Sequence, residues 1–383
     1  MSHRRARKVS LASLAAAAVL GLTLVGSPPA QAGGDHGGGS KDPTVIAKGL
    51  NNPRQLSFTR SGDLLVAEAG SGGSGPCFAG PEGGRVCFGA TGSITKIGAW
   101  GKQSRIITGL PSLGGEGTGE QAIGPSDVAA EGKAVTVLIG LGADPAVRTA
   151  PGMPALAKRM GTLVQTTKHG GLRTIADVSA FEAANNPVPP ADAPDSDPVG
   201  LLVQKGHYVV ADAGGNDVVT VSRRGRIRLV STFATTTLEF PPGSGKHVDM
   251  QAVPTSVAVK GRDGAYYVSQ LTGFPFPKGA ANIYRVDPRT GVKSVYAAGL
   301  TNVTDLAFRG HTLYAVQISS EGLLAGPTGS LVQVKRGGTT PDDHAVVAGG
   351  LFAPYGIAIK GNSAYLTTGA VAPGAGQVIK VRL

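Results

Sequence analysis

The residues best placed to do chemistry are four carboxylates at corresponding points of a repeated pattern. Asp127 and Asp305 stand near the start of short β-rich runs, and Glu68 and Asp212 end others. Where such ends meet, oxygen ligands converge, which suits a hard cation such as Ca²⁺. The sequence therefore predicts these four as metal ligands, and Ca²⁺ as the ion that they would bind. The alternative is that they are solvated, or cap exposed backbone beside a water-filled channel.

A second group of residues is expected to bind a ligand on the same face of the molecule. These residues lie in or beside the longest expected loops, at 67–92, 139–161, 182–199, 269–281 and 316–330, or at strand ends near them. They are Arg148, Asn186, Asp197, Asn216, Gln270, Phe274, Gln317 and Tyr355. Long loops on a rigid scaffold commonly carry binding residues, so we expect a small molecule, a glycan or a protein loop to bind there.

The elements that must position these residues are short β-strands, seen most clearly at 254–300. Four runs rich in β-branched or aromatic residues are bounded there by Gly, Pro or Asp, at 255–259, 265–270, 281–286 and 292–300. Such runs joined by tight turns predict an antiparallel four-stranded sheet. One small sheet cannot bury both of its faces, so it needs neighbours of the same kind.

The same unit recurs along the chain. Six first strands align, at spacings of 49 to 73 residues, beginning at Pro53, Pro125, Pro198, Pro254, Val303 and Pro354. The second strands of these units end at Glu68, Gly140, Asp212, Gln270, Gln317 and Thr368. The sequence therefore predicts an all-β fold, a six-bladed β-propeller of four-stranded antiparallel blades. The last unit lacks a fourth strand, and the run TVIAKGL at 44–50 is expected to complete it, which hides both free edges.

The first 32 residues have the features of a secretory signal peptide. A basic segment precedes an apolar run from Val9 to Val25, and Ala30-Gln31-Ala32 fits a cleavage site. We expect ordinary secretion to the extracellular space, a leader at 33–43 and one propeller domain at 44–383. An uncleaved membrane anchor and twin-arginine export are the alternatives; the apolar run is short for a membrane span.

Charge and composition narrow the partners. Gly accounts for 59 of 383 residues, as expected for many tight turns, and the net charge is +11. The basic residues are scattered singly, with no basic run interleaved with aromatics, so nucleic acid is not expected as a partner. Beyond the signal peptide no stretch is long and apolar enough to cross a membrane, and we expect a monomer.

The two cysteines, Cys77 and Cys87, lie close together in a Gly-rich stretch. In an exported protein such a pair predicts a disulfide that ties the stretch together. A redox or metal-binding pair is the alternative, but this spacing matches no common metal motif.

Phrases spread over the units resemble the ScyD/ScyE family of exported proteins, named from the gene cluster for the cyanobacterial sunscreen scytonemin. The matching runs include LLVAEAGSGGSGPC, FEAANNP (181–187), VVADAGGND (209–217) and YYVSQLTGFPFPKGAANIYRV (266–286). The LTGFPFPKGAA run is the most specific. The family usually has Asn where this chain has Asp197. The resemblance implies an exported propeller with a binding or accessory role.

More distantly, the units are similar to lactonases of the gluconolactonase type and to quinoprotein sugar dehydrogenases. The first class implies a divalent ion at the channel mouth, for which Glu68, Asp212 and Asn216 are available. The second implies basic residues around a quinone, for which Arg148 is available. We therefore expect a binding module first, a metal-dependent lactonase or esterase second, and a dehydrogenase last.

Overall fold

The structure is a computed structural model, and it describes residues 43–81, 83–98, 101–188, 194–261 and 263–383. The expected signal peptide and nearly all of the expected leader lie outside these residues. Within the described part, no helix is long and apolar enough to span a membrane.

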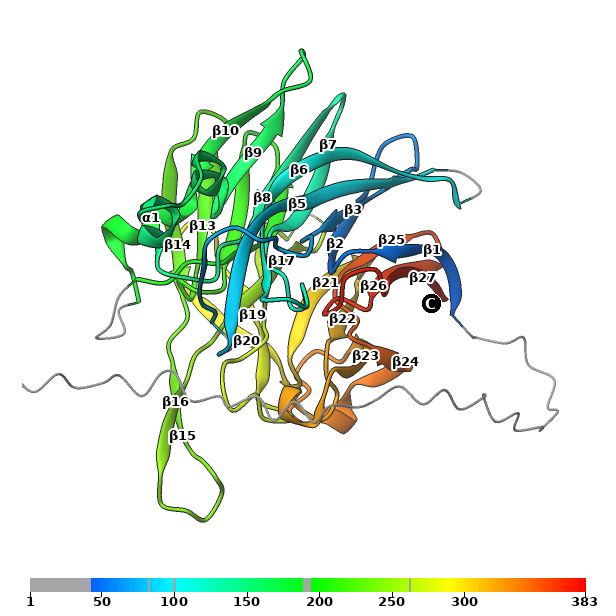
Figure 1. Cartoon of the computed structure of the whole chain (residues 1–383). Helices are drawn as coiled ribbons and strands as arrows, with labels where there is room; N and C mark the ends of the chain where they lie inside the picture. Colours follow the sequence, from blue (N-terminus) through cyan, green and yellow to red (C-terminus); the bar gives the residue numbers. More distant parts are fainter. Residues whose placement is uncertain (1–42, 82, 99–100, 189–193, 262) are drawn as a thin grey trace, which may run out of the picture.

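Antiparallel β-sheets make up the body of the molecule (Figure 1). The first sheet contains β2 (Pro53–Phe58), β3 (Leu64–Glu68), β5 (Arg85–Ile97) and β6 (Gln103–Gly115), with β4 (Cys77–Ala79) beside β5. The second contains β7 (Pro125–Glu131), β8 (Ala134–Ile139), β9 (Thr162–Thr166) and β10 (Leu172–Asp177). The third contains β11 (Pro198–Gln204), β12 (His207–Asp212), β13 (Asp217–Ser222) and β14 (Ile227–Thr232).

The other three large sheets also contain four strands each. One contains β17 (Pro254–Val259), β18 (Tyr266–Gln270), β19 (Ala281–Val286) and β20 (Lys293–Leu300). The next contains β21 (Val303–Arg309), β22 (Thr312–Gln317), β23 (Thr328–Val334) and β24 (Ala345–Phe352). The last contains β25 (Ile357–Lys360), β26 (Ser363–Thr368), β27 (Gly376–Arg382) and, beside β27, β1 (Thr44–Leu50).

A few elements lie outside these sheets. The hairpin of β15 (Thr236–Glu239) and β16 (His247–Met250) projects from the body (Figure 1). The α-helix is α1 (Val178–Asn185), and the 3₁₀ helices are η2 (Pro145–Thr149), η3 (Ala155–Arg159), η4 (Leu323–Ala325) and η5 (Pro341–Asp343).

The core lies between neighbouring sheets. On β12, Val209 and Ala211 pack toward β17 and β18, whereas Tyr208 and Val210 pack toward the sheet of β7–β10. Successive strand residues point to opposite faces, so a strand covered on both sides must be apolar throughout. The first strand of each sheet contacts the first strand of the next, including β25 with β2.

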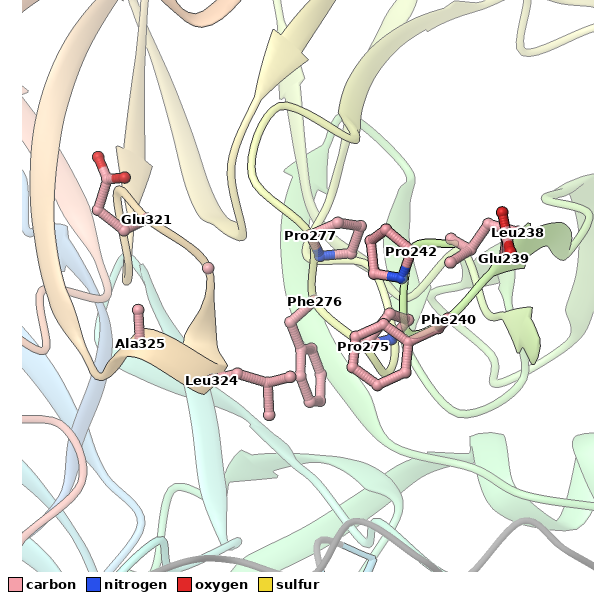
Figure 2. A pocket seen from close by; sticks show the side chains of 11 residues that line it. Leu238, Glu239, Phe240, Pro242, Pro275, Phe276, Pro277, Glu321, Leu324 and Ala325 are labelled. Atoms are coloured by element: carbon pink, nitrogen blue, oxygen red, sulfur yellow. The ribbon is translucent and has the colours of Figure 1, made fainter. Parts of the chain in front are cut away.

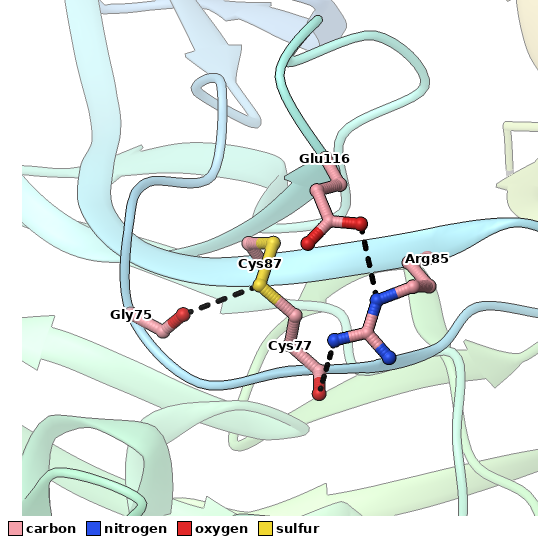
Figure 3. The surroundings of a disulfide bond; sticks show 5 residues. All are labelled: Gly75, Cys77, Arg85, Cys87 and Glu116. Carbon is pink, nitrogen blue, oxygen red and sulfur yellow. Dashed lines mark hydrogen bonds and ion pairs between the residues drawn. A yellow bond between two sulfur atoms is a disulfide. The ribbon is translucent and has the colours of Figure 1, made fainter.

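One expected loop is partly strand. The sequence predicts a loop at 67–92, but β4 lies within it and β5 already begins at Arg85. Cys77 pairs with Cys87 in this added ladder, and the two form a disulfide, which confirms the predicted bond (Figure 3). The Gly-rich composition hides the strands, because Gly is rare in strand interiors and breaks the apolar alternation.

The start of each first strand and the end of each second strand lie on one face. In every large sheet a residue just after the second strand donates its backbone N–H to a carbonyl just before the first strand. The pairs are Ala69 to Asn52, Gly140 to Gly124, Ala213 to Asp197, Leu271 to Val253, Ile318 to Asn302 and Ala370 to Ala353. We call this face the long-loop face, because the connections that enter the first strands and leave the second strands lie on it.

Candidate functional site

The structure does not gather the four carboxylates predicted as metal ligands into one cluster. In the described part of the chain, one group of three potential metal ligands has all its ligand atoms within 4.8 Å, namely Cys77, Cys87 and Glu116. Its two sulfurs are joined in the disulfide. Among the four, Asp127 and Asp305 share one cavity, whereas Glu68 and Asp212 are each held by partners of their own. Their role as metal ligands stays a prediction.

Glu68 holds the first sheet together. Its side chain is fully buried and forms a bidentate ion pair with Arg105 of β6, with a shortest distance of 2.8 Å. Hydroxyl groups of Ser93 and Thr95 and the backbone N–H of Asn51 also donate to it. With this many donors its charge is fully compensated without a metal ion.

Asp127 and Asp305 line a central cavity of about 230 Å³, together with residues from the first strands of all six large sheets. Gln55 and Ser256 stand at the third positions of β2 and β17, and both line the same cavity. Gln55 crosses the cavity, since its Nε2 donates to the carbonyls of Thr255 and Thr304. Asp127, Asp305, Gln55 and Ser256 thus all line this cavity.

Each of these two aspartates joins neighbouring sheets. Asp127 accepts the backbone N–H of Leu201 at 2.7 Å, and Asp305 accepts that of Ile357 at 2.8 Å. Burial raises the pKa of Asp305 to about 6. Burial, and then the nearby charge of Asp305, raise the pKa of Asp127 well above its usual range.

Arg54 and Tyr355 meet on the long-loop face. The Arg54 guanidinium lies 4.7 Å from the centre of the Tyr355 ring, and it donates to the carbonyls of Ala370 and Ala122. Burial raises the pKa of Tyr355 to about 12 and, with the charge of Asp212, raises that of Asp197 to about 7. Tyr355 and Asp197 are partly buried, and Oδ1 of Asp197 accepts the backbone N–H of Leu141 at 3.0 Å.

Four other predicted ligand-binding residues make contacts within the fold, and their role in binding a ligand stays a prediction. Arg148 is 8% exposed and pairs with Asp177 at 2.9 Å. Gln270 accepts the N–H of Asn282, and Gln317 accepts that of Thr301. Asn216 accepts the N–H of Val253, which ties two sheets together.

The two remaining predicted ligand-binding residues, Asn186 and Phe274, have different surroundings. Asn186 ends α1 in a left-handed conformation, with φ of 36°. Phe274 instead packs edge to face on Phe240, with ring centres 5.1 Å apart, and also contacts Phe276. Phe274 therefore supports Phe240, which lines the groove described below.

An open groove of about 440 Å³ lies between the β15–β16 hairpin and the loops at 271–280 and 318–327. Its lining is largely aromatic, proline and aliphatic: Leu238, Phe240, Pro242, Pro275, Phe276, Pro277, Leu324 and Ala325, with Glu239, Glu321 and Gly322. Figure 2 shows Leu324 pointing toward the Phe276 ring, with Phe240 and the prolines on the facing wall. The Leu324 side chain is 60% exposed.

The walls of this groove are held in place by backbone hydrogen bonds. Residues 271–273 donate to the carbonyls of 253, 252 and 251, as in a short ladder. Asn302 fixes both neighbouring loops, since its Nδ2 donates to Leu271 and its Oδ1 accepts from Leu323. Leu271 and Leu323 pack with Tyr355 in one apolar cluster, so the groove borders the Arg54–Tyr355 pair.

Comparisons with known proteins agree on the fold. No family model matches the chain, and no curated protein matches it. The chain is similar in structure to the PQQ-bound aldose sugar dehydrogenase of Streptomyces coelicolor, with TM-score 0.51, 12% identity, and coverage of 88% of this chain and 96% of that one. It is also similar to a gluconolactonase of Xanthomonas campestris, with TM-score 0.50, 9% identity, and coverage of 88% and 89%. Identities this low support a propeller-type fold alone.

Sequence reasoning missed most of the groove. Phe240 and Pro242 lie far along the chain from Leu324, and no pattern in the sequence brings the two segments together. The FPFP run at 274–277 was the available signal, because aromatic residues that alternate with prolines are unusual in a loop.

Proposed function

We propose that this chain is an exported six-bladed β-propeller, closed by β1 in the last blade, that binds a compact apolar molecule in the groove of its long-loop face. The observation that carries the proposal is the groove of about 440 Å³, lined by aromatic and proline side chains. Concave apolar sites of this size accept small organic ligands.

The chemistry of the lining favours a neutral aromatic ligand over a glycan. The lining includes two carboxylates, and both are engaged: Glu321 pairs with Lys278 at 2.7 Å, and Glu239 accepts the N–H of Gly245. Sugar hydroxyls would lose their water partners against rings and prolines, whereas an aromatic ring would not.

The sequence resemblance supports the same groove. The run LTGFPFPKGAA is the most specific part of the likeness to the ScyD/ScyE family, and its Pro275, Phe276 and Pro277 form one wall. A metal-dependent hydrolase is not proposed, because Glu68, one of the residues available for its ion, is already paired with Arg105.

Binding of the neutral dye N-phenyl-1-naphthylamine, followed by its fluorescence, tests the proposal. We expect saturable binding at one site. Leu324→Ser and Phe276→Ala should each weaken binding by roughly fivefold or more, because each removes apolar contact area from the groove.

The matched control is Val346→Ser on β24. Val346 is 65% exposed, much like Leu324, but it does not line the groove. This variant should bind the dye as the unaltered protein does. Equal weakening in Val346→Ser, or unchanged binding in both groove variants, would contradict the proposed site.

A further inference from the structure

Two aspartates face each other at the end of the β12–β13 hairpin. Asp212 and Asp217 are directly paired across the ladder, on either side of the turn at 213–216. Directly opposed side chains of an antiparallel pair lie about 5 Å apart at Cβ, and like charges there destabilise the sheet.

A third carboxylate reaches the same turn from α1. A Cβ atom on Gly215 would lie 3.0 Å from Oε2 of Glu182 and 3.3 Å from Cγ of Asp212. The turn therefore leaves no room for a side chain at 215 and brings backbone close to both carboxylates. Three acidic groups from two elements thus surround one small region.

These carboxylates are buried and short of partners. Glu182 is 2% exposed, and Asp212 and Asp217 are each 1% exposed. Asp212 accepts bonds from Ser196, Asp197 and Gly215, but Oδ2 of Asp217 is buried with no hydrogen-bond partner in the described part of the chain.

Among the residues that the structure describes, no side-chain cation is paired with the carboxylates of Glu182, Asp212 or Asp217. The Asn186 amide, oriented so that its nitrogen donates, gives Glu182 one hydrogen bond at 3.1 Å. An uncompensated buried carboxylate costs several kcal/mol, so this region must take up either protons or an external cation.

We propose that Glu182, Asp212 and Asp217 bind a calcium ion between α1 and the β12–β13 turn. Hard oxygen ligands with flexible geometry suit Ca²⁺ better than Mg²⁺, which demands a strict octahedron. Without the ion the three carboxylates do not all come within 4.8 Å of one another. Binding of the ion therefore requires Glu182 to move toward the turn, where the ion would balance the like charges.

Calcium titration of the full purified chain, first stripped with a chelator, tests this site by calorimetry and thermal melting near neutral pH. Unaltered protein should bind one ion and melt several degrees higher with Ca²⁺ than without, since the ion binds only the folded state. In Asp217→Asn and Glu182→Gln, Ca²⁺ affinity should fall at least roughly tenfold. Ion-free Asp217→Asn should also melt higher than the ion-free unaltered protein, because one of two opposed charges is gone.

Asp305→Asn is the matched control, because it removes a buried carboxylate from the central cavity instead. This variant should keep the full calcium response. The proposal is overturned if the ion-free protein shows neither heat nor thermal shift up to about 10 mM Ca²⁺. It is equally overturned if Asp305→Asn loses the response while Asp217→Asn keeps it. A rise in melting temperature that appears only on acidification, and not with Ca²⁺, would also overturn it, because protons would then compensate the carboxylates.

Discussion

Asp127 and Asp305 show how a side chain can be placed correctly by a pattern and still have another role. Their alignment at the third position of a first strand predicts that both face the channel, and both do. The alignment cannot reveal that each carboxylate accepts a backbone N–H from the next sheet, because that contact depends on how adjacent sheets are rotated. Residues that look like metal ligands in one strand are here connections between strands.

The raised pKa of Asp305 predicts a pH dependence with a definite sign. Its folded pKa, about 6 through burial, lies above the ordinary value of 3.8, so the folded state holds the proton more tightly. This group therefore favours folding most below about pH 4, and its contribution is lost as the pH rises to about 6. Asp305→Asn should remove that loss from the free energy of unfolding, measured with urea across this range.

Asp343 is the control of opposite sign. Hydrogen bonds from Lys335 and from the Thr339 and Thr340 backbone lower the pKa of its carboxyl, so its contribution is lost as the pH falls. Asp343→Asn should leave the decline between about pH 4 and pH 6 in place. If Asp305→Asn and the unaltered protein decline equally, Asp305 does not titrate as its burial requires.

The β4–β5 ladder shows where strand prediction from sequence fails. Alternating apolar residues predict β12, β18 and β22, whose ends at Asp212, Gln270 and Gln317 fall as expected. The first part of β5 carries Gly89 and Gly92, and close contacts explain both. A Cβ on Gly89 would meet the Gly72 carbonyl at 2.0 Å, and one on Gly92 would meet the Pro125 ring at 2.6 Å. Such glycines belong to a tightly packed strand in the structure, but in the sequence they favour the prediction of a loop.

Loss of the disulfide should loosen this ladder more than it unfolds the molecule. Three residue pairs join β4 to β5, and an exposed ion pair of Arg85 with Glu116 lies beside them, so the Cys77–Cys87 bond is the strongest local constraint (Figure 3). Cys77→Ser/Cys87→Ser should cost about 2–3 kcal/mol at most.

Amide exchange by mass spectrometry checks this prediction. Exchange at 70–92 should rise strongly in the double serine variant, while exchange in β21–β24 stays nearly unchanged. Uniform acceleration in both regions would mean that the disulfide stabilises the whole fold. Unreduced protein should also weigh two hydrogens less than its reduced form.

The order of strands over the whole chain was predictable because each unit carries its own signal. Repeats at Pro53, Pro125, Pro198 and Pro254 need no knowledge of distant contacts. The groove and the acidic region at α1 were not predictable, because they join loops of different sheets whose separation in space depends on every unit between them. The two similar solved structures add little there, since they are 12% and 9% identical to this chain.

The contact of β1 with β27 joins the two ends of the sheet order. Register pairs run from Thr44 with Lys380 to Leu50 with Gly376, and Leu50 is fully buried. Without β1, β27 would become an edge strand with unsatisfied backbone groups, and Ala47 and Leu50 would leave their apolar cluster.

We therefore predict that stability depends on residues 44–50 and not on those before them. A chain that begins at Thr44 should melt near the temperature of the chain that begins at Gly33. A chain that begins at Asn51 should melt far lower or aggregate, because the exposed edge of β27 can pair with another molecule. Adding a synthetic peptide of residues 44–50 to the shorter chain should restore part of the lost stability by mass action. If both truncated chains melt alike, β1 is not the strand that closes the propeller.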